Sequence, residues 1–414
     1  MGNTPNIRFK GFTDDWEQRK LGEICQRVIR KNKNNESDLP LTIASQYGLI
    51  DQRDFFNKVV AAKDMSNYYL LRKGEFAYNK SYSNGFEYGS IKRLNAYEQG
   101  CLSTLYICFE ITSDEVDSDY LECFFDTLKW YGDLSMICAE GARNHGLLNV
   151  DIKAFFADIN VSTPTNLKEQ RKIATYLNNL DHLITLHQRK CDETKKLKKF
   201  MLQKMFPKKD AKKPEIRFAG FTDDWEQRKL GDICSRVQGN DGRMELPTLT
   251  ISAANGWMKQ EDRFSGNIAG KEQTNYTLLH KGELSYNHGN SKLAKYGTVF
   301  SLQTYEEALV PRVYHSFKVE NGSADFIEYY FATKIPDREL RKLISSGARM
   351  DGLLNIGYDD FMGIKMMFPS ASEQDKIAEY FRALDHIITL HQRKCDELKE
   401  FKKYMLQNMF PQKG

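Results

Sequence analysis

Two loops of equal length, set in nearly identical flanking sequence, carry the side chains of this chain that are best suited to contacting nucleic acid. The loops are KSYSNGFE (Lys80–Glu87) and HGNSKLAK (His288–Lys295), and they agree only at Ser83 and Ser291. Lysine, asparagine, serine, tyrosine and histidine side chains can bond to base edges and phosphates. The candidate contact residues in the loops are Lys80, Tyr82, Ser83, Asn84, His288, Asn290, Ser291, Lys292 and Lys295.

The sequence that flanks each loop is kept while the loop is exchanged. The pattern Leu-Leu-x-Lys-Gly-Glu-x-x-Tyr-Asn precedes each loop (Leu70–Asn79 and Leu278–Asn287), and Tyr-Gly follows it. A second pattern, Gly-Ala-Arg-x-x-Gly-Leu-Leu-Asn, begins at Gly141 and again at Gly347 and changes only at its two central positions. Loops on a rigid frame usually carry binding specificity, so we expect the exchanged segments to select the ligand. The second pattern adds Arg143, Asn144, His145 and Arg349 to the candidate contact residues.

The sequence lacks the common catalytic motifs. It has no G-x-G-x-x-G for a dinucleotide, no G-x-x-x-x-G-K-[ST] for a nucleotide phosphate and no G-x-S-x-G nucleophile elbow. No Asn-Pro or Asp-Pro dipeptide occurs, so the loop typical of amino-methyltransferases is missing. His182 and His187, repeated as His386 and His391, are five residues apart and would lie on different helix faces. We therefore expect no catalytic site, metal or cofactor in this chain itself.

The whole chain is one unit repeated in tandem. IRFKGFTDDWEQRKLGEICQRV (Ile7–Val28) recurs at Ile216–Val237 with three changes. Between these shared starts and the shared ends, the two halves mix short β-type runs with helix-like segments, which indicates mixed α/β (α+β) cores. The runs we expect are strands at Leu105–Phe109 and Val310–Phe317 and helices at Tyr120–Tyr131 and Asp325–Thr333.

A long repeated stretch after each core has the pattern of one extended helix. Each copy opens with a capping-box pattern, from Asn166 and from Ser370, and each stops at Phe-Pro. About 40 helical residues would span on the order of 60 Å. The seam expected from a 3.5-residue spacing contains Ile173, Leu180, Leu183, His187, Thr194 and Met201. A duplication folded about an internal two-fold axis would pair the two helices antiparallel, so we predict an antiparallel coiled coil with a core at each end.

These patterns divide the chain into five parts. They are a first core (1–165), a first helix (166–206), a linker (207–215), a second core (216–369) and a second helix (370–410). The net charge of +4 neither demands nor excludes nucleic acid. There is no apolar run long enough to cross a membrane and no signal-peptide pattern, and the eight cysteines form no C-x-x-C pair. We therefore expect a cytoplasmic protein with reduced thiols.

The helix motifs resemble those of the specificity subunit of type I restriction–modification enzymes. The motifs are Glu-Gln-x-Lys-Ile-Ala (from Glu169 and Glu373), the Leu-Asp-x-x-Ile-x-Leu-x-Gln-x-Lys continuation and the terminal Leu-Gln-x-Met-Phe-Pro. The Lys73-Gly74-Glu75 stretch with its following Tyr-Asn is similar to the target-recognition domain of that family. The resemblance covers essentially the whole chain. It departs at residues 162–165, where the family usually has a more proline-rich run.

The resemblance implies a function for each part. Each core would be a target-recognition domain that reads one half of a bipartite double-stranded DNA sequence, and the paired helices would set the gap. Two methyltransferase subunits, which bind S-adenosylmethionine, would dock on this scaffold, and motor-nuclease subunits that use ATP and magnesium would join them. The helix residues expected at the partner contact are Leu180, Leu183, Leu186, Leu384, Ile387 and Leu390. A protein-binding scaffold without DNA readout, and a methyltransferase or nuclease with an unfamiliar site, are the alternatives.

Overall fold

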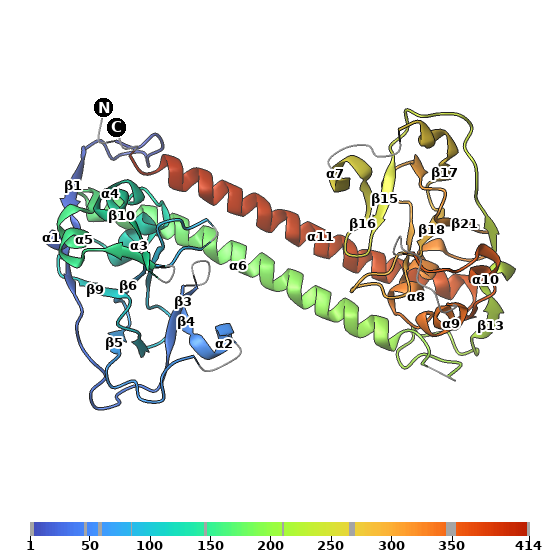
Figure 1. The fold of residues 1–414 in the computed structure, drawn as a ribbon, viewed down its shortest axis with the longest axis horizontal. Coiled ribbons are helices and arrows are strands. Elements are labelled where there is room, and N and C mark those ends of the chain that lie inside the picture. The colour runs from blue at the N-terminus through green and yellow to red at the C-terminus, as the bar shows by residue number, and fades with distance from the viewer. Residues whose placement is uncertain are drawn as a thin grey trace. The chain divides into compact units, whose positions relative to one another are not determined.

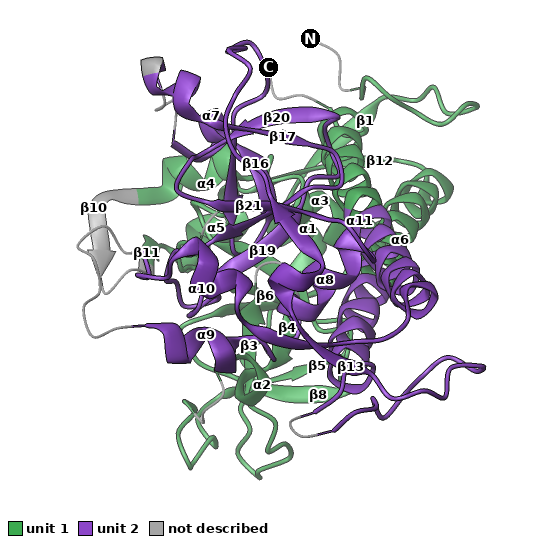
Figure 2. Cartoon of the chain, turned by 90° about the vertical axis from the view of Figure 1, so that its right-hand side faces the viewer, with its two compact units in different colours: residues 1–187, 393–414 green, residues 188–392 purple. Residues whose placement is uncertain are grey.

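The computed structural model separates the chain into two compact units (Figures 1 and 2). The first unit contains residues 1–187 and 393–414, and the second contains residues 188–392. The structure describes residues 4–44, 48–56, 60–83, 85–144, 147–208, 211–264, 270–344 and 353–411. Each unit therefore combines a core with part of both long helices. The predicted boundaries at 165/166 and 369/370 separate each core from the long helix that follows it. The compact units instead divide each long helix between them, at 187/188 and at 392/393.

The first unit is built on a four-stranded antiparallel sheet with strand order β2-β9-β6-β7, accompanied by two-stranded pairs. Its strands are β1 (Trp16–Lys20), β2 (Cys25–Arg27), β3 (Leu41–Ala44), β4 (Gly48–Asp51), β5 (Tyr69–Arg72), β6 (Phe76–Asn79), β7 (Ser90–Arg93), β8 (Gln99–Leu102), β9 (Ile107–Ile111), β10 (Cys138–Asn144), β11 (Leu147–Val150) and β12 (Asn160–Pro164). Its helices are α1 (Leu21–Ile24), α2 (Gln52–Phe56), α3 (Ser118–Asp126), α4 (Tyr131–Ile137), α5 (Ile152–Asp158) and the start of α6 (Leu167–Lys204).

The second unit repeats this plan with the sheet order β14-β21-β18-β19. Its strands are β13 (Glu226–Lys229), β14 (Cys234–Arg236), β15 (Leu249–Ser252), β16 (Gly256–Lys259), β17 (Thr277–His280), β18 (Leu284–Asn287), β19 (Thr298–Ser301), β20 (Glu307–Val310), β21 (His315–Val319) and β22 (Lys365–Phe368). Its helices are η1 (Leu230–Asp232), α7 (Gln260–Phe264), η2 (Gly270–Asn275), α8 (Ala324–Ala332), α9 (Asp337–Leu343), α10 (Tyr358–Met362) and most of α11 (Ala371–Asn408). The two four-stranded sheets correspond strand by strand, so the diverged cores keep one fold.

The prediction of mixed α/β cores followed by long helices is confirmed, and two of its finer elements are wrong. The expected strand at Val310–Phe317 is two strands, because Pro311 cannot donate to the ladder and the Tyr314 N–H closes a turn on its carbonyl. The expected helix at Tyr120–Tyr131 is likewise broken after α3, where Leu128 takes a positive φ of 59°. The expected strand at Leu105–Phe109 begins two residues later, as β9.

The end of α11 completes the core of the first unit. Phe410 is fully buried, with its ring 5.9 Å from that of Trp16 and 5.6 Å from that of Tyr120. The backbone joins there too, because the Ile7 N–H donates to the carbonyl of Asn408 at 2.9 Å. The lysine amine of Lys129 donates to the carbonyl of Phe410 at 2.5 Å. The first core is therefore made from residues at both ends of the chain.

The second unit contains the matching arrangement at the end of α6. Phe206 is buried, with its ring 6.1 Å from that of Trp225 and 5.5 Å from that of Phe326. The Ile216 N–H donates to the carbonyl of Lys204 at 2.9 Å. The repeated Phe-Pro that ends each helix thus places a phenylalanine against the repeated tryptophan of a core.

The two long helices run antiparallel within each unit. In the first unit Asp181 of α6 accepts from Lys402 of α11 at 2.7 Å, and in the second unit Asp385 of α11 accepts from Lys198 of α6 at 2.5 Å. These pairs are related by the duplication. Burial alone would lower the pKa of Lys402, but Asp126 and Asp181 outweigh it, so the pKa is raised. Because an unpaired buried charge is costly, the pairs favour this register over a shifted one.

The Glu-Gln dipeptide near the start of each helix has a structural role. Glu169 is buried and binds Arg8 through both carboxylate oxygens, at 2.7 and 2.9 Å, and Glu373 binds Arg217 in the same way. Gln170 accepts from the backbone of Asp117 at 2.7 Å, at the N-terminus of α3. The dipeptide therefore fastens each long helix to its own core.

We predict that truncating either phenylalanine destabilises one unit selectively. Phe410→Ala removes a buried ring, and the expected loss is about 3–5 kcal/mol from the first unit. Phe206→Ala is the matched variant for the second unit. Hydrogen exchange on the full chain should show loss of protection around Trp16 in the first variant and around Trp225 in the second. Equal loss in both units from one substitution would contradict this assignment.

Candidate nucleic-acid interface

The first candidate loop connects β6 to β7, and three residues of the repeated frame hold its base. The buried Tyr78 hydroxyl donates to the Tyr88 carbonyl at 2.8 Å, and the Asn79 side chain accepts from the Ser81 N–H at 3.0 Å. Gly89 closes the loop with a φ of +80°, and a Cβ there would lie 2.0 Å from the Asn79 carbonyl oxygen. The frame is therefore repeated because it fastens both ends of the loop.

The second loop, between β18 and β19, has the same base. The Tyr286 hydroxyl donates to the Tyr296 carbonyl at 2.7 Å, and the Asn287 side chain accepts from the Gly289 N–H at 3.0 Å. Gly297 has a φ of +81°, and an added Cβ would lie 2.5 Å from the Tyr286 ring. Burial raises the pKa of both frame tyrosines, so these hydroxyls remain protonated donors.

The one position at which the two loops have the same residue marks a common turn. Ser83 exchanges backbone hydrogen bonds with Phe86, at 3.3 and 2.8 Å. Ser291 does the same with Ala294, at 3.1 and 3.2 Å. Different side chains are thus presented on the same backbone turn.

The two repeated patterns, far apart in the sequence, meet at the start of each loop. The carbonyl of Lys80 accepts from the Leu148 N–H at 3.0 Å, and the carbonyl of His288 accepts from the Leu354 N–H at 2.8 Å. Leu148 and Leu354 are the second leucines of the Gly-Leu-Leu-Asn motifs. The structure therefore brings the loop and the end of the Gly-Ala-Arg pattern together in both units.

Most of the candidate contact residues that the structure describes are accessible. Tyr82 is 53% exposed, and Lys80 and Ser83 are half-buried. The exposed candidate residues of the second loop are Asn290, Ser291, Lys292 and Lys295, and Leu293 between them is exposed as well. Burial lowers the pKa of Lys80. Asn84, His145, Arg349 and the side chains of Arg143 and Asn144 lie outside the described part of the chain.

His288 is placed differently from the expectation. Its side chain is 5% exposed, and its ring nitrogens lie 2.7 Å from the Leu354 carbonyl and 2.8 Å from the Val313 carbonyl. Its ring stacks on that of His315 at 5.0 Å, and burial lowers the pKa of His315. The sequence placed His288 among the candidate contact residues, but this first residue of the loop turns into the core. His288 supports the loop from below and is not available for a ligand in this conformation.

The six helix residues expected at a partner contact fall into two groups. Leu180 and Leu384 are buried in the cores, where they help to attach the helices. Leu183, Leu186, Ile387 and Leu390 are between 37% and 53% exposed. Four further apolar residues are exposed on the helices, namely Leu197, Phe200, Phe401 and Tyr404. Their spacing of three residues repeats that of the predicted partner contact, which could have identified them from the sequence.

The described ranges contain no group of three His, Cys, Asp or Glu side chains placed so as to hold a metal ion. No helix of the described residues is long and apolar enough to cross a membrane. The features that stand out are the paired loops and the apolar helix surface, and both suit binding.

Comparison with known proteins gives three findings. A family model described as the type I restriction modification DNA specificity domain matches residues 13–196 and again residues 222–400. The type I restriction enzyme MjaVIII specificity subunit of Methanocaldococcus jannaschii is 24% identical over 333 residues, which cover 75% of this chain and 73% of that protein. The crystal structure of a type I restriction–modification system S subunit from M. genitalium matches with a TM-score of 0.59 and 14% identity. It covers 99% of this chain and 100% of that one, which shows a shared fold.

Gly85 in the first loop and Gly89 in the frame that closes it allow a controlled test of how the frame holds the loop. Gly85 and Gly89 share a φ of +80°, but only the Cβ of Gly89 would meet a neighbour. Gly85→Ala should cost the left-handed strain alone, about 1–2 kcal/mol. Gly89→Ala should cost clearly more, because the Asn79 carbonyl must also move. The two losses of stability are measured by chemical unfolding of the first unit, with hydrogen exchange as the readout. Equal losses for the two variants would contradict the role of Gly89 in closing the loop.

Proposed function

The chain belongs to the type I restriction modification DNA specificity family, and from this premise we propose that it is the DNA-recognition subunit of a type I restriction–modification complex. Each unit reads one half of a bipartite, asymmetric target in double-stranded DNA. The reactions belong to partner subunits, which bring S-adenosylmethionine, ATP and magnesium. The observation that carries the proposal is that one repeated frame holds two different loops on the same backbone turn.

The accessible loop side chains have the chemistry for reading base pairs. Asn290 presents an amide, which can pair bidentately with adenine, and Lys292 presents an amine, which can donate to guanine. Lys295 is suited to a phosphate. In the first unit Tyr82 has the exposed ring, and Lys80 contributes less. The segments that contain Arg143 and Arg349 complete the proposed contacts. Because the two loops differ, the two half-sites should differ in sequence.

The paired helices would set the gap between the half-sites. α6 and α11 each contain 38 residues, which correspond to about 57 Å of helix. A dimeric DNA-binding protein commonly reads half-sites about 34 Å apart, one helical turn. The Asp–Lys pairs Asp181–Lys402 and Asp385–Lys198 support this role, because they oppose a change of register within each unit.

The exposed apolar residues of the helices suit two methyltransferase subunits. Leu183 and Leu186 of α6 have the repeat-related counterparts Ile387 and Leu390 of α11, and all four are partly exposed. Apolar residues at positions a and d of a heptad favour packing against a further helix. Since the duplication repeats this surface, we expect two equivalent docking sites. Motor-nuclease subunits would join the assembly that forms there.

A protein-binding scaffold is the second candidate, and the apolar helix surface favours it. That function needs the helices but not the loops. The two candidates differ in the salt dependence of DNA binding, because phosphate contacts release counterions and make the affinity fall steeply with salt. A complex with partner proteins that has no sequence-dependent DNA affinity would support the scaffold.

We predict that exchanging the loops changes one half of the target. Residues 81–87 are replaced by residues 289–295, while Lys80 and His288 stay in place because His288 packs below its own loop. The chain is expressed with its methyltransferase partner in a host that lacks adenine methylation, and modified bases are mapped by long-read sequencing. The half-site of the first unit should change and the other should persist. An unchanged motif would remove the loops from base reading.

A single substitution tests the second loop more finely. Lys292→Ala should weaken one half-site by about 1–3 kcal/mol, roughly fivefold to 150-fold, if it reads a base. Lys292→Arg is the matched control that keeps the charge. Competition binding with DNA duplexes that vary only in that half-site measures the effect. A uniform loss across all sequences would indicate a phosphate contact instead.

The docking sites should be separable by substitution. Leu186→Ser should remove one of two bound methyltransferase subunits, Leu390→Ser the other, and the double variant both. The side chains are exposed, so the fold should be retained. Lys195→Ser and Lys399→Ser, at repeat-related exposed positions elsewhere on the helices, are the controls. Native mass spectrometry counts the subunits, and an unchanged count in the double variant would exclude this surface.

A further inference from the structure

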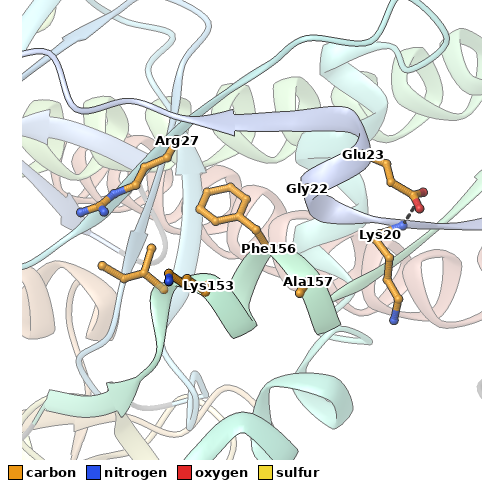
Figure 3. A pocket seen from close by; sticks show the side chains of 8 residues that line it. Lys20, Gly22, Glu23, Arg27, Lys153, Phe156 and Ala157 are labelled. Atoms are coloured by element: carbon orange, nitrogen blue, oxygen red, sulfur yellow. Dashed lines mark hydrogen bonds between the residues drawn. The ribbon is translucent and has the colours of Figure 1, made fainter.

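An open groove in the first unit lies beside α1 and α5, and the candidate loop residues do not line it (Figure 3). Its volume is about 540 Å³, within the range of sites that bind small ligands or side chains. Phe156, Ile152 and Ala157 form an apolar floor, and Arg27 and Lys153 lie at its rim. Figure 3 shows Lys20 and Glu23 on the other side of Phe156 from Arg27.

Local contacts hold the walls of this groove in place. The backbone N–H of Lys20 donates to the Glu23 carboxylate at 3.0 Å, which fixes the start of α1. Gly22 packs so closely that an added Cβ would lie 3.1 Å from the Phe156 carbonyl oxygen. Arg27 donates to the Tyr69 hydroxyl at 3.1 Å, which leaves its guanidinium plane beside the groove.

The second unit supplies an internal comparison for the same place. Phe155 stacks on Tyr78 at 5.2 Å, and Phe361 stacks on Tyr286 at 4.3 Å, so α5 and α10 are equivalent. Ile152 lies three residues before Phe155, and Tyr358 lies three residues before Phe361. Tyr358 of the second unit is therefore the counterpart of Ile152 of the first. The guanidinium of Arg236, the counterpart of Arg27, lies 4.3 Å from the centre of the Tyr358 ring. In the second unit this arginine is covered by an aromatic ring of the same chain.

The residues that line the groove are also more positively charged in the first unit than their counterparts in the second. The groove of the first unit has three cationic residues and one carboxylate among its lining residues, Lys20, Arg27, Lys153 and Glu23. In the second unit the repeat-related residues are Lys229, Arg236, Asp359 and Asp232, two cations and two carboxylates. The second unit thus contains an aromatic residue followed by an acidic one, Tyr358-Asp359, where the first contains Ile152-Lys153. The first unit keeps the arginine and adds a cation but lacks the ring.

We propose that this groove binds a segment of a partner protein in which an aromatic residue is followed by an acidic residue. The ring lies on the apolar floor against the guanidinium of Arg27, as Tyr358 lies against Arg236. The carboxylate then meets Lys153, which stands where the second unit has Asp359. Stacking of an aromatic ring on arginine is favourable, and arginine offers a planar face that lysine lacks. The second unit fills the place itself and so leaves one such site per chain.

The test uses the full chain and a peptide that copies its own internal occupant. The peptide is acetylated and amidated and has the sequence of residues 355–360, NIGYDD. Saturation-transfer NMR detects weak binding, and titration to saturation gives the relative number of sites. Control peptides have leucine in place of the tyrosine or asparagine in place of both aspartates. A short single-stranded oligonucleotide is the competing anion.

The variants make the expected results specific. Ile152→Tyr with Lys153→Asp copies the second unit and should abolish binding, whereas Ile152→Val with Lys153→Arg should retain it. Arg27→Lys and Arg27→Ala should weaken binding by roughly fivefold to thirtyfold, with alanine the more severe. Tyr358→Ile with Asp359→Lys should open the equivalent site in the second unit. The amount of peptide bound at saturation should then double. Every variant is checked for folding by hydrogen exchange.

The opposite results overturn the proposal. They are no binding of the peptide, equal binding by the variant that copies the second unit, and equal binding of the leucine peptide. Displacement of the peptide by the oligonucleotide at matched charge would assign the groove to nucleic acid and would also overturn it. The candidate loops are untouched in all these variants, so the DNA-recognition proposal is tested separately.

Discussion

The packing of one phenylalanine against one tryptophan, repeated in each unit, is the contact on which the rest of the structure depends. Phe410 reaches Trp16 from the far end of the chain, and Phe206 reaches Trp225. A fully buried aromatic ring contributes several kcal/mol, which is a large share of the stability of a domain. This burial attaches the end of each long helix to a core, and the antiparallel pairing of α6 and α11 within each unit follows from it.

The duplicated frame separates what must be constant from what must vary. Tyr78, Asn79 and Gly89 use their hydroxyl, amide and positive φ to hold the two ends of a loop, and none of these roles constrains the residues between. Loop contents can therefore change without a cost to the core. Proteins that recognise different ligands with one fold commonly use this division, and it accounts for identical flanks around dissimilar loops.

Duplication also makes each unit a reference for the other. Positions that agree, such as the Glu169–Arg8 and Glu373–Arg217 pairs, serve the shared architecture. Positions that disagree on the same backbone, such as Ile152 and Tyr358, are the ones free to take separate roles. Such a difference is informative because the surrounding backbone is the same in both units. Where one unit lacks a side chain that the other has, the side chain of the second unit indicates which kind of group could bind in the first.

The sequence alone determined the repeat, the long helices, the mixed cores and the positions of the loops, because periodicity, capping patterns and equal loop lengths are local properties. It could not determine the strand order, the break at Pro311 or the division of each helix between two units, since these depend on contacts between distant residues. The burial of His288 was equally hidden. Whether a polar or apolar side chain on a loop or helix faces the core is decided by what packs there, such as the carbonyls of Val313 and Leu354 around His288.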